Sequence, residues 1–151
     1  MTAASRSELR RLEALVGTWR TEGWTREAPG APAMRIDAVD TYEWLPGGFG
    51  LLHIVDAKVG DERVEGAEII GYDPALANFR TQYFGSDGPS AYEASLEEED
   101  GALVWRMQSE SDRFAGTFAD DGDTLEGRWE ARGEDATWRP WMDIALTRQA
   151  A

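Results

Sequence analysis

The residues best suited to chemistry in this chain are one histidine and a few acidic and tyrosine side chains. His53 is the only histidine among 151 residues. If Asp40 and Glu68 both lay beside it, their carboxylates would raise the pKa of the imidazole. Such a group suits proton transfer, with His53 or a carboxylate as base and a tyrosine as donor. The same side chains would equally make a satisfied polar network that fixes the core or holds water. The residue types alone leave both interpretations open.

An enzymatic role for this cluster would be isomerisation, dehydration or cyclisation without a cofactor. His53 would act as general acid or base, oriented by Asp40 or Glu68. Tyr42 or Tyr83 would stabilise an enolate-like oxygen. Asp40, His53 and Glu68 also resemble the two-carboxylate, one-histidine sets that hold Fe, Mn or Zn. Nothing in their spacing requires an ion, and we expect no metal.

The elements that must position these side chains are predicted to be β-strands. Short runs of β-branched and aromatic residues alternate with turn clusters such as Pro46-Gly47-Gly48 and Asp120-Asp121-Gly122-Asp123. Their spacing predicts about ten antiparallel strands. A meander of that size closes into a barrel, because an open sheet would leave two bare edges. We predict one all-β domain, 1–151, with a short N-terminal helix at 5–15 and a single closed up-and-down β-barrel at 16–149.

The stretch YEWLPGGFGLLHIV, residues 42–55, predicts which way His53 points. With Gly47-Gly48 as a two-residue hairpin loop, Tyr42 pairs with His53. The face that holds both residues is the more apolar and aromatic one, so we place it inside the barrel. Its members are Met34, Ile36, Ala38, Asp40, Tyr42, Trp44, Leu51, His53, Val55 and Ala57.

The following strands extend this inner face. Pairing Val59 with Val64 puts Glu68 inside, beside Val55 and diagonal to the histidine. Pairing Tyr72 with Phe79 then brings Thr81 and Tyr83 inward as well. A slip of one residue at any turn would reverse every later assignment.

The second half of the barrel is predicted to have a more apolar interior. Pairing Leu96 with Leu103 would set Glu93 opposite Arg106 on the outer face. Pairing Phe118 with Leu125 sets Arg113 opposite Glu130, again outside. Opposite charges across strands favour these registers. The inner face then holds Tyr92, Trp105, Met107, Phe114, Phe118, Leu125, Trp129 and, at its end, Trp138.

Composition narrows the classes of partner. The formal net charge of −14 at pH 7 repels phosphate backbones and anionic lipid heads, so we expect neither nucleic acid nor membrane as partner. No apolar run is long enough to span a bilayer, and the N-terminus lacks the apolar core of a signal peptide. Without cysteines there is no disulfide or thiol chemistry, and we predict a cytoplasmic protein. Seven tryptophans indicate a crowded core or an aromatic-lined cavity.

The stretch LEALVGTWRTEG, residues 12–23, resembles the opening of calycin-type barrels (lipocalins, fatty-acid-binding proteins and their relatives). In those barrels a short helix leads into a Gly-x-Trp motif, here Gly17-Thr18-Trp19, and in lipocalins an arginine on the last strand lies across the tryptophan. Arg148 occupies a suitable place, and we assign this pair to structure. The GGF…EGAEIIGYDP pattern looks like a bacterial lipocalin-like family of unknown function. The similar nitrobindins bind haem through a histidine near the C-terminus, which is missing here. We therefore predict no cofactor, with haem ligation through His53 as the disfavoured alternative.

Three functions follow from this barrel, and we favour the first. The barrel binds a small, mostly apolar or aromatic molecule, with Tyr42, His53 and Glu68 orienting its polar end. The alternatives are the acid/base enzyme described above and a filled structural barrel, which could form a homodimer. The predicted ligand-binding residues are Tyr42, Trp44, His53, Glu68, Tyr72, Tyr83, Trp105, Met107, Phe114 and Trp129. Catalytic roles, if there is turnover, fall to His53, Asp40, Glu68 and Tyr42.

Overall fold

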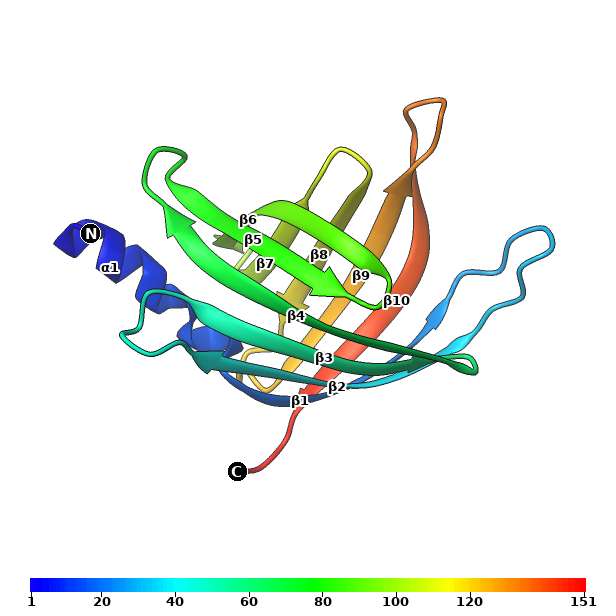
Figure 1. Cartoon of the computed structure of the whole chain (residues 1–151), viewed down its shortest axis with the longest axis horizontal. Helices are drawn as coiled ribbons and strands as arrows, with labels where there is room; N and C mark the ends of the chain where they lie inside the picture. Colours follow the sequence, from blue (N-terminus) through cyan, green and yellow to red (C-terminus); the bar gives the residue numbers. More distant parts are fainter.

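The computed structural model describes residues 1–151 as a short N-terminal helical segment followed by ten strands (Figure 1). The helical segment comprises α1 (Ala3–Arg10) and the 3₁₀ helix η1 (Arg11–Leu15). The strands are β1 (Gly17–Thr25), β2 (Arg35–Trp44), β3 (Leu51–Val59), β4 (Glu62–Asp73), β5 (Asn78–Gly85), β6 (Gly88–Glu99), β7 (Ala102–Gln108), β8 (Asp112–Phe118), β9 (Thr124–Arg132) and β10 (Trp138–Arg148).

The strands form one closed antiparallel barrel. Each strand pairs with its neighbours along the chain, and β1 closes the ring by pairing with β10. The predicted up-and-down barrel is therefore confirmed. Closure leaves no strand with a bare row of backbone hydrogen-bonding groups, which is the usual reason that a long meander curls up.

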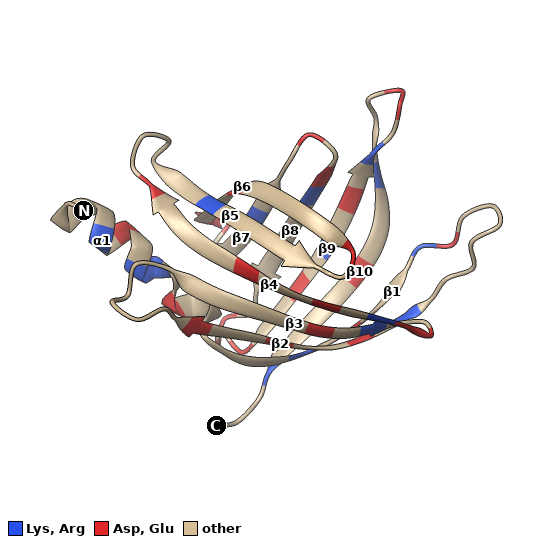
Figure 2. Ribbon diagram, in the orientation of Figure 1, with Lys and Arg blue, Asp and Glu red and all other residues tan.

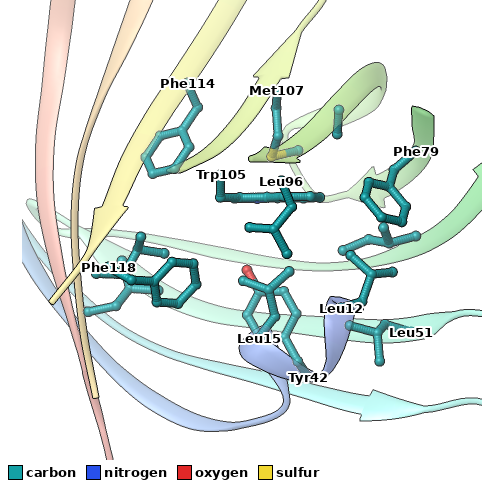
Figure 3. Packing of buried hydrophobic residues seen from close by; sticks show 14 of the residues in the cluster. Leu12, Leu15, Tyr42, Leu51, Phe79, Leu96, Trp105, Met107, Phe114 and Phe118 are labelled. Atoms are coloured by element: carbon teal, nitrogen blue, oxygen red, sulfur yellow. The ribbon is translucent and has the colours of Figure 1, made fainter. Parts of the chain in front are cut away.

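The helical segment plugs one end of the barrel. Its side-chain cap is Thr2, which accepts a hydrogen bond from the backbone N–H of Ser5 at 3.0 Å, so the helix starts two residues before the predicted position. Leu9, Leu12 and Leu15 are each at most 1% exposed and pack into the barrel core. Figure 1 shows the segment at one end of the barrel, and Figure 3 shows Leu12 and Leu15 among the inward residues of the strands.

The Gly17-Thr18-Trp19 motif builds the floor of the same end. Trp19 is fully buried, and its indole N–H donates to the carbonyl of Leu15 at 2.8 Å. The guanidinium of Arg148 lies 4.2 Å from the centre of the Trp19 ring, which confirms the predicted stacking. Arg148 also donates to the carbonyls of Val16 and Ala14 and so ties the last strand to the helical segment.

The inward and outward faces follow the predicted alternation, although two registers differ. The pairs Tyr42 with His53, Tyr72 with Phe79 and Phe118 with Leu125 are confirmed. The register of β3 with β4 is shifted by two residues, so that Val59 faces Glu62 and not Val64. Since the shift is an even number of residues, every side chain keeps its predicted face.

A second two-residue shift occurs between β6 and β7. Leu96 faces Trp105 and not Leu103, so Arg106 lies opposite Ser95 and bonds Glu99 instead of the predicted Glu93. The two differences have different causes: the β3–β4 turn is tighter than predicted, whereas the β6–β7 turn lies one residue further along the chain than predicted. The turns Gly60-Asp61 and Asp100-Gly101 contain only two residues, with positive φ at Gly60, Asp100 and Gly101, as tight hairpins require.

The position predicted for Trp138 is wrong. The register of β9 with β10 shifts between Pro140 and Met142, and this bulge separates Trp138 from the inward residues that follow. Trp138 pairs with Arg132 and lies outside, with the guanidinium of Arg113 4.4 Å from its ring centre. The inward residues of β10 are Met142, Ile144 and Leu146, which pair with Trp129, Gly127 and Leu125.

Charged residues occur along the strands, in the helical segment and in the hairpin loops (Figure 2). No Lys or Arg is among the buried residues, whereas Asp40 and Glu68 are buried. No helix of the protein combines the length and the apolar character that crossing a membrane requires.

Candidate functional site

Three ionisable side chains from adjacent strands meet inside the barrel and form what we call the polar cluster: Asp40 of β2, His53 of β3 and Glu68 of β4. His53 Nε2 lies 2.6 Å from Asp40 Oδ1, and its Nδ1 lies 2.9 Å from Glu68 Oε1. The second oxygen of Asp40 accepts a hydrogen bond from the hydroxyl of Thr21 on β1 at 2.5 Å. The cluster that the sequence predicted is therefore assembled, with Thr21 as an additional member.

The strand registers explain this geometry. His53 lies directly opposite Tyr42 on β2 and directly opposite Glu68 on β4. The sequence placed Glu68 diagonal to His53, and the tighter turn at Gly60-Asp61 moves it into the facing position. Directly facing side chains lie about 5 Å apart at Cβ, which allows a carboxylate to reach an imidazole nitrogen.

His53 is an imidazolium held between two carboxylates. A carboxylate oxygen can only accept hydrogen bonds, so both ring nitrogens must donate. Burial by itself lowers the pKa of His53, but the hydrogen bonds and charges of Asp40 and Glu68 outweigh it and raise the pKa to about 9. At pH 7 His53 therefore carries a positive charge between the two carboxylate groups.

This geometry limits what His53 can do. Neither ring nitrogen has a lone pair that faces the barrel interior, so the imidazole cannot accept a proton from a bound molecule without breaking a bond to a carboxylate. The same holds for ligation of a haem iron, which the residues present do not fit. No three His, Cys, Asp or Glu side chains are arranged to hold a metal ion.

Tyr42 covers one face of the imidazolium. The two rings are parallel within 7°, with their centres 4.0 Å apart. Burial is the main reason that the pKa of Tyr42 is raised well above its ordinary value, and the charges of Asp40 and Glu68 add to it. Its hydroxyl therefore stays protonated, and Figure 3 shows this oxygen pointing toward the middle of the barrel, below Trp105.

Two polar atoms beside the cluster have no partner in the protein. Glu68 uses Oε1 for His53, and its Oε2 bonds no protein group. Thr81 of β5 is 4% exposed, and its Oγ1 is the one buried side-chain polar atom that finds no hydrogen-bond partner. Thr81 faces Ile70, two residues beyond Glu68 on β4, so the two unpartnered groups are close neighbours on the inner surface.

The opposite side of the interior is apolar, and we call it the aromatic wall: Trp105, Met107, Phe114 and Trp129. Phe114 and Trp129 lie with ring centres 5.2 Å apart, and Tyr92 adds a ring 5.5 Å from Trp129. Trp105, Met107 and Phe114 are buried, whereas Trp129 and Tyr92 are half-buried. Trp129 and Tyr92 are therefore the most solvent-accessible part of the apolar interior.

The remaining predicted ligand-binding residues make their contacts outside the polar cluster, although Tyr83 pairs with Glu68 across β4 and β5. Tyr83 turns toward the rim, where its hydroxyl donates to Asp87 at 2.7 Å. Trp44 lies at the plugged end and donates from Nε1 to Glu13 at 2.6 Å. Tyr72 packs edge-on against Phe79 with ring centres 5.6 Å apart. These three predictions are untested by the geometry, and we leave the three residues out of the proposed site.

Tyr92, Thr21 and Thr81 are the residues that the sequence-based site omits. Tyr92 and Thr81 were placed on the inner face by alternation, but nothing in their neighbourhood marked them as ligand groups. Thr21 was missed because β1 carries no turn signal that fixes its register with β2. The observed pairing of Thr21 with Ala38 puts it diagonal to Asp40.

A surface hollow of about 640 Å³ lies elsewhere on the molecule. It is on the outside of β6 and β7, where Glu93, Ser95, Arg106 and Gln108 face away from the barrel axis. It does not include the polar cluster, and its open, polar lining gives it no convergent set of functional groups.

A family model described as "Protein of unknown function (DUF1579)" matches residues 4–148. The chain belongs to this family. No curated protein sequence matches the chain.

Two solved structures share the fold of this DUF1579 protein. Rv2717c from M. tuberculosis superposes with a TM-score of 0.68 at 12% identity, covering 95% of this chain and 98% of that chain. The S-type phycobiliprotein lyase CPES from Guillardia theta has a TM-score of 0.62 at 11% identity, with 99% of each chain covered. These likenesses agree with the lipocalin-like resemblance at the level of fold, and at such low identity they carry no activity.

Proposed function

We propose that this protein binds a small, mostly apolar or aromatic molecule inside the barrel, with the polar end of the molecule at the polar cluster. One observation carries the proposal: Thr81 Oγ1 is buried without a hydrogen-bond partner and Glu68 Oε2 bonds no protein group, and both residues lie on the inner surface that also carries the aromatic wall. Buried polar atoms are normally satisfied by the protein or by water. Small-molecule sites are usually lined by apolar and aromatic side chains together with a few polar groups that can bond the ligand.

The energetics of the polar cluster support this function. Three ionisable groups inside a barrel cost free energy to desolvate, and a well-packed apolar core would be at least as stable. Their side chains also remain slightly accessible, at 11% for Asp40 and His53 and 5% for Glu68. Groups that are costly for folding and still reachable from the interior are better explained by a ligand than by stability.

The acid/base enzyme is the weaker alternative. Its predicted general base, His53, already donates both ring protons to carboxylates. Within the cluster, a substrate could contact only Glu68 Oε2, as a proton acceptor, and the Tyr42 hydroxyl, as a proton donor. The imidazole would take no part in proton transfer. The phycobiliprotein lyase shares the fold at 11% identity, and a likeness of fold brings neither pigment nor reaction to this chain.

The test uses N-phenylnaphthylamine, a neutral dye whose fluorescence rises in apolar surroundings, together with native mass spectrometry of protein purified from its own organism. We expect saturable dye binding at one site per chain, or a small molecule that co-purifies and is displaced by the dye. Trp129→Leu removes a ring of the aromatic wall and should weaken dye binding by about tenfold. Trp138→Leu removes a ring from the outer face of the neighbouring strand and should leave binding unchanged.

Two outcomes would overturn the proposal. A filled structural barrel would show neither dye binding nor a co-purified molecule. Equal loss of dye binding in both tryptophan variants would place the dye outside the barrel interior.

A further inference from the structure

The unpartnered atoms of the polar cluster also indicate the chemical class of the ligand, an inference that rests on the proposed function. Asp40 has both oxygens engaged, by His53 and by Thr21, and the imidazolium has both nitrogens engaged. Glu68 Oε2 is the one carboxylate oxygen of the cluster that accepts no hydrogen bond from the protein. A carboxylate oxygen accepts hydrogen bonds and attracts positive charge, so the cluster presents an acceptor to the interior and not a donor.

The charges of the interior point the same way. Two carboxylates and one imidazolium leave one negative charge that no other buried group offsets, because no Lys or Arg is buried. An uncompensated charge in a poorly solvated site is costly, and a ligand of opposite charge removes that cost. A ligand with a carboxylate or phosphate group would add a second uncompensated negative charge.

The tyrosines around Glu68 locate this negative charge. Burial is the leading reason that the pKa values of Tyr83 and Tyr92 are raised, and the charge of Glu68 contributes to both. The same charge acts on Tyr42. In the fold, Tyr83 lies directly opposite Glu68, and the ring of Tyr42 stacks on the imidazolium that Glu68 binds. Aromatic faces also attract cations.

We propose that the barrel selects a cationic ligand: an aromatic or aliphatic molecule whose protonated amine binds Glu68 Oε2. The apolar body of the molecule lies against the aromatic wall, over the packed rings of Phe114 and Trp129. The hydroxyl of Thr81, buried and without a partner, accepts a second N–H of the same ammonium group. This arrangement gives Glu68 Oε2 and Thr81 Oγ1 a hydrogen-bond partner each, and it balances the net negative charge of the polar cluster.

The experiment compares three ligands with the same naphthalene body at pH 7 by isothermal titration calorimetry. Naphthylethylamine is a cation, naphthylethanol is neutral and naphthylacetate is an anion. We expect the amine to bind at least about tenfold more tightly than the alcohol, and the acetate to bind most weakly. Glu68→Gln should reduce the preference for the amine over the alcohol to less than about threefold while it leaves binding of the alcohol nearly unchanged.

A matched control removes the same charge from the outer face. Glu43 follows Tyr42 on β2 and is exposed, so Glu43→Gln changes the net charge equally without touching the interior. It should keep the full preference for the amine. If Glu68→Gln does not fold, the order of the three ligands on the wild-type protein still decides, because their bodies are the same and only their charge differs.

The outcomes separate this inference from the proposed function. Dye binding with equal affinities for amine and alcohol, or with the acetate bound most tightly, overturns the cationic ligand and leaves the proposed function standing. A preference for the amine that survives Glu68→Gln also overturns it. Failure of the dye and of all three ligands to bind overturns both.

Discussion

The strands β2, β3 and β4 line the barrel interior with ionisable side chains, whereas β7, β8 and β9 line it with aromatic and aliphatic ones. Both regions alternate inward and outward residues in the same way, and both lie on the inner surface of the same closed barrel. Removing the charged groups of the polar cluster from water destabilises the folded state. Burying the large apolar side chains of the aromatic wall stabilises it. The aromatic wall therefore builds the fold, and the polar cluster is retained for another reason, which we infer to be a ligand.

The aromatic wall should carry the larger share of stability. Trp105 is 2% exposed and contacts the core cluster, with its ring centre 6.1 Å from that of Phe79. Replacing it with alanine leaves a large cavity, and we expect a loss of about 4 kcal/mol in the free energy of unfolding, measured by urea denaturation. A loss below about 1 kcal/mol would mean that the interior collapses around the site and that the wall is not a rigid core.

Breaking the polar cluster from one side should cost nearly as much. Asp40→Asn removes one carboxylate and leaves the His53–Glu68 pair and Thr21 badly matched, and we expect a loss of about 3 kcal/mol in the same assay. The combined change Asp40→Val, His53→Leu and Glu68→Met should come within about 1 kcal/mol of the wild type, because it removes every buried charge at once. It should also abolish preference for a cationic ligand. A triple variant as unstable as the single one would show that the cluster is needed for folding.

The sequence predicts which residues face the interior more reliably than it predicts which residues pair between strands. The face of each residue depends only on alternation, so errors of two residues in the turns after Val59 and after Glu99 left every strand with the correct face inside. The exact pairing depends on turn length, and a two-residue turn is hard to distinguish from a four-residue one in a stretch such as Gly60 to Arg63. Trp138 was misplaced because nothing in the sequence marks the bulge after Pro140.

The members of the polar cluster were predictable, but the hydrogen bonds that they make were not. Alternation puts Asp40, His53 and Glu68 inside, yet only the true register makes His53 face Glu68 and use both nitrogens. The orientation of Tyr83 is beyond alternation as well. Its ring lies over Gly66 and Gly85, whose missing Cβ atoms leave space for it, and its hydroxyl reaches Asp87 at the rim. Side-chain direction along a strand depends on neighbours from other strands, which one sequence does not reveal.

The polar cluster should also make stability depend on pH in a range where the aromatic wall does not. The pKa of His53 is raised from 6.5 to about 9, so its stabilising contribution is complete below pH 6.5 and is lost as the pH rises through 9. We expect the free energy of unfolding to fall by about 2 kcal/mol between pH 7 and pH 9. The triple variant, which has no imidazole, is the control and should lack this decrease. A wild-type profile parallel to that of the triple variant would contradict the buried imidazolium.

Charges on the outer face should matter least, which sharpens the contrast with the interior. Arg113 and Glu130 face each other across β8 and β9, with Nε and Oε1 2.7 Å apart, but both side chains are partly exposed. Water screens such a pair, so Glu130→Gln should cost less than about 1 kcal/mol and the loss should shrink in high salt. Glu126→Gln, on the same face of β9 without an ion-pair partner, serves as the control for removing one negative charge. A loss at Glu130 as large as that at Asp40 would mean that inward and outward charges contribute alike, and that the polar cluster is not specialised for a ligand.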